Sequence, residues 1–276
     1  MIGQKNNLDT IKNQLYNNTF PHFSIIVGPK GSGKKTLAHS ILKLNHKYFN
    51  GEVALEDVKV DSIRNMVDDS YKYRNVLFII PDADGMSLNA KNALLKVVEE
   101  CPNNNYYVMT LEDDANTLDT IKSRGTIYRM ESYTVKELAT YIDKYYLLTS
   151  VQEERDIARE LCDTPGEVDL LMEMNGINFY EYVEKVLDNI TEVSGANAFK
   201  IGDEIALKNE DDNYDLKLFF KAFMRLCLKR YQDLQGTKYL DWITITGRYL
   251  RDLRITGINK QMLFDSWILE IRSTEI

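Results

Sequence analysis

The sequence predicts an α/β fold, a parallel sheet with helices on both faces, followed by a region of helices alone. An apolar segment, Phe23 to Val27, runs into a glycine-rich turn and then into a segment with helical spacing of apolar residues. Two further apolar runs, 75–80 and 106–111, are typical of strands buried in a parallel sheet. After Tyr133 no convincing strand pattern follows. We therefore expect an α/β domain first and helical domains after it.

The α/β part is predicted to alternate helices with strands. Apolar residues at helical spacing indicate a helix over 4–18, which Pro21 ends. The further predicted elements are a helix from the glycine-rich turn to 47, a short strand at 53–55, a helix capped by Asp61, the strand 75–80, a helix over 87–100 capped by Ser87, the strand 106–111, a short helix over 114–123 and a strand at 126–130. Such alternation requires crossover connections and hence parallel strands.

The helical part shows repeated start signals. Thr134-x-x-Glu137 and Ser150-x-x-Glu153 both match the capping box that begins a helix. Further helices are predicted from Pro165, around 179–190, around 216–227 and after Asn259, while Trp242 to Ile255 is ambiguous because ITIT alternates like a strand within helical surroundings. The changes in pattern predict three domains, 1–131, 132–195 and 196–276.

Composition narrows the class of protein. The 276 residues are 44% hydrophobic, which favours a globular core. The net charge of −8 argues against free-standing DNA binding. No apolar run is long enough for a membrane span, and no signal peptide pattern is present, so a cytoplasmic protein is expected. Cys101, Cys162 and Cys227 are too widely separated for a metal or disulfide framework.

The glycine-rich turn has the spacing of a phosphate-binding loop, Gly28-x-x-x-x-Gly33-Lys34. Backbone N–H groups and the following helix would attract phosphate, and Lys34 would reach the β and γ phosphates. The Ser or Thr expected next, a Mg²⁺ ligand, is replaced by Lys35, and Thr36 points about 100° away on a helix. The predicted nucleotide-binding residues are Gly28, Pro29, Lys30, Gly31, Ser32, Gly33, Lys34, Lys35 and Thr36.

Several longer stretches resemble the AAA+ subunits of DNA polymerase clamp loaders, and most closely the bacterial DNA polymerase III delta-prime subunits. These stretches are VLFIIPDADGMSLNAKNALLKVVEECP at 76–102 and TLDTIKSR at 117–124, with shorter matches at 2–4, 58–64 and 164–166. The resemblance implies an AAA+ domain at 1–131, a helical lid at 132–195, a helical collar at 196–276 and assembly into a hetero-oligomeric ring. The four-cysteine zinc module of bacterial relatives is missing, because no cysteine precedes Cys101, as in a compact, phage-like version.

The same alignment places unsuitable residues at the catalytic positions. Pro81 stands where relatives have the magnesium-binding aspartate, and Asp82 where they have the catalytic glutamate. Glu112 falls at the first sensor and Asp169 at the sensor arginine of the lid. A carboxylate beside the γ-phosphate would repel it. The resemblance therefore implies absent or very slow hydrolysis, weak binding of ATP or ADP, and no magnesium or zinc site, with Lys35 a candidate to fill the magnesium volume.

Two further roles are implied only by the resemblance. Ser123 and Arg124 match the Ser-Arg-Cys motif, with Gly125 in place of cysteine, whose arginine enters the ATP site of a neighbouring subunit. The alternative is a surface arginine at a helix C-terminus. Lys91 and Lys96 lie on the helix that faces DNA in relatives, where the alternative is two solvated lysines.

The function expected from these residues is a non-hydrolysing, delta-prime-like subunit that provides Arg124 to an adjacent ATPase during sliding-clamp loading. Its partners would be other clamp-loader subunits and, through the complex, the sliding clamp and primer–template DNA, with no membrane. Two alternatives stay open: an active ATPase subunit of a clamp loader, and a nucleotide-binding interaction scaffold unrelated to clamps.

Overall fold

A computed structural model of the chain describes residues 2–115, 117–190, 215–253 and 259–274. It divides into two compact units. The first comprises Met1–Glu137 together with Thr164–Gly166, and the second comprises Leu138–Asp163 and Glu167–Ile276. The first unit corresponds to the expected α/β fold, and within the described residues all strands lie in it.

The first unit is built on a five-stranded parallel sheet with strand order β2-β3-β4-β1-β5. The strands are β1 (Phe23–Val27), β2 (Gly51–Ala54), β3 (Val76–Ile80), β4 (Tyr106–Leu111) and β5 (Thr126–Arg129). Every residue of β1, β3 and β4 is buried. This is why these three strands are almost entirely apolar in sequence, with Ser24 and Thr110 as the polar exceptions.

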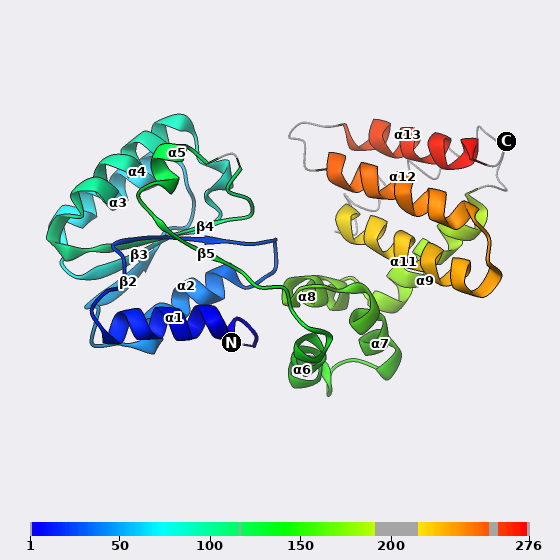
Figure 1. Cartoon of the computed structure of the whole chain (residues 1–276), viewed down its shortest axis with the longest axis horizontal. Coiled ribbons are helices and arrows are strands. Elements are labelled where there is room, and N and C mark those ends of the chain that lie inside the picture. The colour runs from blue at the N-terminus through cyan, green and yellow to red at the C-terminus, as the bar shows by residue number, and fades with distance from the viewer. Residues whose placement is uncertain (1, 116, 191–214, 254–258, 275–276) are drawn as a thin grey trace. The chain divides into compact units, whose positions relative to one another are not determined.

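Helices cover both faces of this sheet (Figure 1). They are α1 (Lys5–Tyr16), α2 (Lys34–Leu44), α3 (Val60–Lys72), α4 (Leu88–Glu100) and α5 (Asp119–Lys122). Alternate residues of a strand point to opposite faces, so Ile25 packs in the cluster beneath α3 and α4, and Ile26 in the cluster beneath α1 and α2. The two faces thus have separate hydrophobic cores.

Two expectations in this unit are wrong in detail. Asp61 does not cap α3, because the N-cap is Lys59, whose backbone N–H donates to the Asp57 carboxylate at 3.0 Å. The helix predicted over 114–123 is only α5, because Asp113 accepts a hydrogen bond from the Ala115 N–H and holds that stretch in a turn. Ser87 does cap α4, accepting from the Ala90 N–H at 3.3 Å.

Within the described residues, helices are the only regular secondary structure of the second unit. Its helices are α6 (Val135–Tyr146), which begins in the first unit, α7 (Gln152–Leu161), α8 (Pro165–Glu173), α9 (Gly176–Asn189), α11 (Leu216–Leu234), α12 (Lys238–Asp252) and α13 (Lys260–Ser273). One hydrophobic cluster extends from Ile142 to Ile271. The predicted lid–collar boundary near 195 lies outside the described residues, but described residues on both sides of it share this cluster.

The ambiguous segment is helix α12, apart from 254–258, which lies outside the described residues. Its alternating threonines are compatible with a helix because each hydroxyl has a partner. Thr244 donates to the Leu240 carbonyl at 2.9 Å, and buried Thr246 accepts from Trp267 Nε1 at 3.0 Å. Trp267 belongs to an aromatic core with Phe223 and Trp242. Burial against these rings decides the conformation where the alternating pattern alone did not.

The two predicted capping boxes have different outcomes. Thr134 and Glu137 form theirs: the Thr134 N–H donates to the Glu137 carboxylate at 2.8 Å, and the Glu137 N–H to the Thr134 hydroxyl at 3.3 Å. Ser150 does not cap α7, whose N-cap is Val151. Its hydroxyl donates instead to the Tyr146 carbonyl at the end of α6, at 2.8 Å. A serine that follows one helix closely can complete that helix rather than begin the next.

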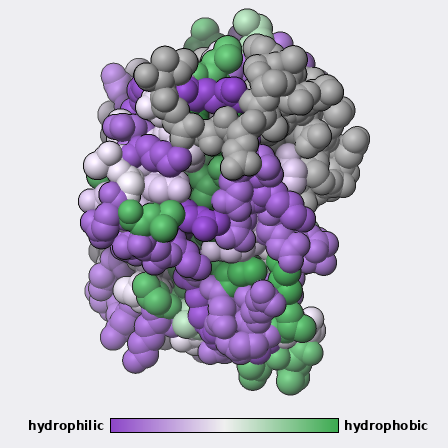
Figure 2. Space-filling model, turned by 90° about the vertical axis from the view of Figure 1, so that its right-hand side faces the viewer, coloured by the Kyte–Doolittle hydropathy of each residue, from purple (hydrophilic) through white to green (hydrophobic). Residues whose placement is uncertain are grey.

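The surface of the second unit is mixed, and Figure 2 shows separate groups of hydrophobic side chains among mainly hydrophilic ones. Large exposed apolar residues include Tyr145 near the end of α6, and Leu147, Leu148 and Val151 between α6 and α7. No helix among the described residues is long and apolar enough to cross a membrane.

Candidate functional site

The phosphate loop connects the end of β1 to the start of α2. Gly31 and Gly33 have φ of 77° and 85°, values that favour glycine, and Gly33 is the N-cap of α2. Because β4 pairs with β1, and β3 pairs with β4 in the same parallel sheet, Asp82 and Glu112 follow strands that end at the same edge as the loop. The sheet therefore brings together the predicted loop, Asp82 and Glu112.

The side chain of Lys34 does not extend away from the phosphate loop but bonds to the loop backbone. Its Nζ donates to the Gly28 carbonyl at 2.7 Å and the Pro29 carbonyl at 3.0 Å. The residue is only 6% exposed. Burial lowers the pKa of its ammonium group, against the opposing effect of Glu112. The lysine expected to reach phosphate is thus bound to its own loop.

A carboxylate occupies the neighbourhood of the loop backbone. Glu112 Oε1 accepts a hydrogen bond from the Lys30 N–H at 3.0 Å. Asp84 holds the Glu112 main chain in place, its two oxygens accepting from the Glu112 N–H at 2.9 and 2.8 Å. One anion-binding N–H of the loop is therefore satisfied by the protein itself. Sequence reasoning had placed Glu112 here but had missed Asp84.

Lys35 lies where a magnesium ligand is expected and makes an ion pair instead. Its Nζ is 2.6 Å from Asp82 Oδ2, and the two side chains are 54% and 64% exposed. Asp82 itself has φ of 48°, and its N–H donates to Thr110 Oγ1 at 2.9 Å. Pro81 has no ligand atom, and Thr36 is exposed on α2. These residues do not fit a magnesium–nucleotide. The position expected to supply a Mg²⁺ ligand carries the Lys35 ammonium group, whose positive charge would repel the ion.

Two further hydrogen bonds within the first unit are accepted by backbone carbonyls of the phosphate loop. The Gly166 N–H donates to the Gly31 carbonyl at 3.0 Å, and a Cβ on Gly166 would lie 2.4 Å from Gly31 Cα. The Tyr133 hydroxyl donates to the Ser32 carbonyl at 2.9 Å. Sequence reasoning missed Tyr133, because nothing local to an aromatic residue after β5 indicates a partner about a hundred residues earlier.

Asp169, the predicted lid sensor position, lies in the second unit and is satisfied there. Its carboxylate accepts hydrogen bonds from the Tyr141 hydroxyl at 2.8 and 2.9 Å and from the Tyr146 hydroxyl at 2.7 Å. Both tyrosines have raised pKa values, because burial and the adjacent carboxylate disfavour the phenolate. The carboxylate thus joins α6 to α8.

Arg124 follows α5 and is held by two groups. Its Nη2 is 2.5 Å from Glu99 Oε1 on α4, and its Nη1 donates to the Thr120 carbonyl at 2.7 Å. The hydroxyl of Ser123 donates to the same carbonyl at 3.2 Å. The Arg124 side chain remains 37% exposed. Sequence reasoning had not named Glu99.

Gly125 fits because its neighbours leave no room for a side chain. A Cβ there would lie 2.8 Å from the Ile25 side chain and 3.0 Å from the Phe23 ring. Both residues belong to β1, so the backbone after Arg124 is seated directly on the central strand. This close packing accounts for glycine where the resembling motif has cysteine.

Arg124 and the phosphate loop lie at opposite ends of β1. Thr126 of β5 pairs with Ser24 near the start of β1, so Arg124 lies before that start, whereas Gly28 follows the end. Because a strand rises about 3.3 Å per residue, the whole length of β1 separates Arg124 from Gly28 along the strand direction. Arg124 is therefore not placed to serve the loop of its own chain.

Lys91 and Lys96 both lie on α4, where Lys96 is exposed and Lys91 half-buried. Five residues along a helix turn the side-chain direction by about 140°, so the two do not share one face. Contact of both with one DNA backbone stays a prediction.

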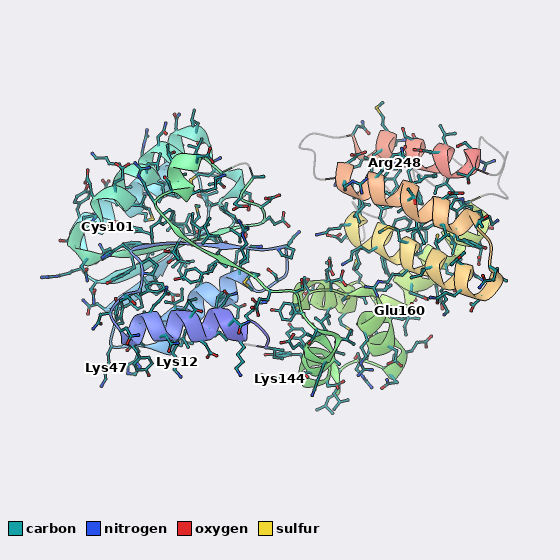
Figure 3. The ribbon with its side chains drawn as sticks, in the orientation of Figure 1. Lys12, Lys47, Cys101, Lys144, Glu160 and Arg248 are labelled. Carbon is teal, nitrogen blue, oxygen red and sulfur yellow. The ribbon has the colours of Figure 1, made fainter. Side chains whose placement is uncertain are left out.

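The cysteines have no partners for a metal site within the described residues, where no cluster of three or more His, Cys, Asp or Glu side chains could hold a metal ion. Cys162 and Cys227 are buried, and burial raises their pKa values. Figure 3 labels Cys101 in the first unit, where it is the C-cap of α4.

Comparison with known proteins gives consistent matches. A family model described as "DNA polymerase III, delta subunit" matches residues 44–134. Replication factor C subunit 3 of Schizosaccharomyces pombe is 25% identical over 52% of this chain and 45% of its own length. Replication factor C subunit 4 of Encephalitozoon cuniculi is 22% identical over 96% of this chain and 90% of its own.

The chain is similar to clamp-loader subunits of the AAA+ family. The first two curated relatives are matched over only 45% and 42% of their lengths, so the chain spans about half of each.

Solved structures are similar to this chain in fold. A DNA polymerase III gamma subunit-related protein of Thermotoga maritima aligns with a TM-score of 0.53 and 18% identity, over 98% of this chain and 99% of that one. The RuvB Holliday junction branch migration motor of Thermotoga maritima aligns with a TM-score of 0.52 and 19% identity, over 98% and 88%. The α/β AAA+ fold with a helical C-terminal region is thereby confirmed.

Proposed function

We propose that the chain is a delta-prime-like subunit of a DNA polymerase clamp loader that hydrolyses no ATP itself and provides Arg124 to the ATP site of a neighbouring subunit. Its partners would be other clamp-loader AAA+ subunits in a hetero-oligomeric ring. Through that ring it would act on a sliding clamp and primer–template DNA during replication.

The observation that carries the proposal is the separation of Arg124 from the loop of its own chain. Arg124 precedes the start of β1 and Gly28 follows its end. An arginine that stabilises a transferring phosphoryl group must reach that group, so the ATP it serves would belong to another subunit. Its exposed fraction of 37% is compatible with such a contact.

The loop supports the non-hydrolysing half of the proposal. Lys34 binds two loop carbonyls, Glu112 binds a loop N–H, and Lys35 pairs with Asp82. ATP bound in such a loop would meet a carboxylate and would lack a magnesium ligand from Pro81 or Lys35. ATP or ADP would therefore bind weakly, without a magnesium site and without turnover.

The test is the DNA-stimulated ATP hydrolysis of this chain mixed with its cognate ATPase subunit. Arg124→Ala should lower the rate by about 10³-fold, the lower end of the range for arginine fingers supplied in trans. Lys122→Ala is the matched control, because it removes one positive charge from α5, where Lys122 pairs with Asp119 at 2.8 Å. The isolated chain should show no turnover. Equal rates for the wild-type and Arg124→Ala mixtures would reject the finger role, and turnover by the isolated chain would favour the active-ATPase alternative.

A further inference from the structure

The guanidinium of Arg124 is fixed by contacts at two different nitrogen atoms. Nη2 lies 2.5 Å from Glu99 Oε1, and Nη1 donates to the Thr120 carbonyl at 2.7 Å. A single contact would leave the planar group free to rotate about that hydrogen bond, whereas two contacts at different nitrogens fix its plane. Arginine has five N–H donors, so these contacts leave donors for another anion.

The two anchors differ in what they connect. Thr120 is in α5, the same short element that precedes Arg124, so its carbonyl fixes the arginine only locally. Glu99 is in the last turn of α4, and this helix buries Leu94, Val97 and Val98 in the core of the first unit. Glu99 thus ties the arginine to a rigid element.

We infer that Glu99 is a positioning residue for Arg124, which orients the guanidinium for the anion of a neighbouring subunit. This inference rests on the proposed function. Glu99 itself would not touch the nucleotide and would act only through the arginine. The side chain of Glu99 is 49% exposed, so the pair is held weakly enough to adjust when a phosphate approaches.

Glu100 provides a matched control on the next residue of α4. Its carboxylate accepts a hydrogen bond from the Tyr71 hydroxyl of α3 rather than from an arginine. Glu99→Gln and Glu100→Gln therefore make the same chemical change one residue apart. Only the first alters the partner of Arg124.

The contact is tested first on the isolated full-length chain, without any partner. Phenylglyoxal modifies exposed arginines, and peptide mass spectrometry reports the rate at Arg124. Glu99→Gln should raise that rate by about threefold, as expected for loss of a surface ion pair, while Glu100→Gln leaves it unchanged. Equal rates in the wild type and Glu99→Gln would overturn the inference, whatever the chain's function.

The positioning role is tested in the mixture with the ATPase subunit. Glu99→Ala should lower kcat by about tenfold with little change in KM for ATP, because orientation affects the transition state more than binding. In the Arg124→Ala background the same substitution should have no effect, since Glu99 acts through Arg124. An equal loss in both backgrounds would overturn the positioning role. If Arg124→Ala alone changes nothing, the proposed function fails. The positioning role then fails with it in this assay, even where the modification rates support the contact between Glu99 and Arg124.

Discussion

The phosphate loop and the Arg124 region both carry cations suited to phosphate, but their surroundings differ. Lys34 is 6% exposed and donates to two backbone carbonyls of its own loop. Arg124 is 37% exposed and is held by Glu99, whose side chain is 49% exposed. Lys34 therefore bonds to the protein itself, whereas Arg124 keeps N–H donors accessible. The spacing of a phosphate-loop motif is therefore no guide to which cation is available to a ligand.

The difference also concerns anions. At the loop, Glu112 accepts from the Lys30 N–H and is itself held by Asp84, so the protein supplies the negative charge that a nucleotide would bring. At Arg124 the competing carboxylate is a single exposed glutamate, a contact worth about 1 kcal/mol or less. Exchange for phosphate is easier at the second site.

The largest change expected in nucleotide binding comes from removing the protein's own charges at the loop. In Glu112→Gln combined with Lys35→Thr, the repelling carboxylate is lost and a hydroxyl ligand for Mg²⁺ is gained. We expect the affinity for ATP with Mg²⁺ to rise by about 10²-fold, or about 2.8 kcal/mol, by isothermal titration calorimetry. Asp113→Asn is the control, because Asp113 accepts from the Ala115 N–H and not from the loop. A similar gain in the control would show that general charge, not the Glu112 contact, weakens binding.

How far the sequence predicts this site depends on how local each contact is. The strand–loop–helix order, the strand ends at Asp82 and Glu112, and the Ser87 cap follow from periodicity and from short motifs. Glu99 and Tyr133 could not be predicted in this way. Each meets its partner only after separate elements pack together, and no local pattern pairs either residue with that partner.

The same limit explains the errors in the helices. Ser150 matches the capping pattern as well as Thr134 does, but the carbonyl of Tyr146 competes for its hydroxyl. Asp61 is a good capping residue, but the chain begins α3 at Val60 and leaves Asp61 inside the first turn. A local motif states what a side chain can do, and the neighbouring backbone decides which option is used.

The packing of Gly125 against β1, which positions the backbone beside Arg124, gives the next contrast. It depends on packing rather than on charge. Gly125→Ala would place a Cβ 2.8 Å from the Ile25 side chain. We expect a loss of about 2 kcal/mol in the free energy of unfolding, measured with denaturant. Ile25→Val, which removes the Cδ1 atom, should recover part of that loss in the double variant. Gly85→Ala is the control, since a Cβ there meets nothing within 4 Å. Equal losses at both glycines would mean that backbone entropy, not the seat on β1, governs the result.

The smallest effect is expected at the lysine that defines the motif. Lys34→Met keeps most of the aliphatic volume and removes the charge, so the free energy of unfolding should change by less than about 1 kcal/mol. Burial lowers the pKa of Lys34 in the folded state, so the unfolded chain binds more protons as the pH approaches 10.5. The wild type should therefore gain stability relative to Lys34→Met as the pH rises towards 10.5 from below. In the mixture with the ATPase subunit, Lys34→Met should hydrolyse ATP at the wild-type rate, in contrast to Arg124→Ala. Loss of that activity in a folded variant would mean that the loop takes part in the reaction and that the contrast between the two regions is wrong.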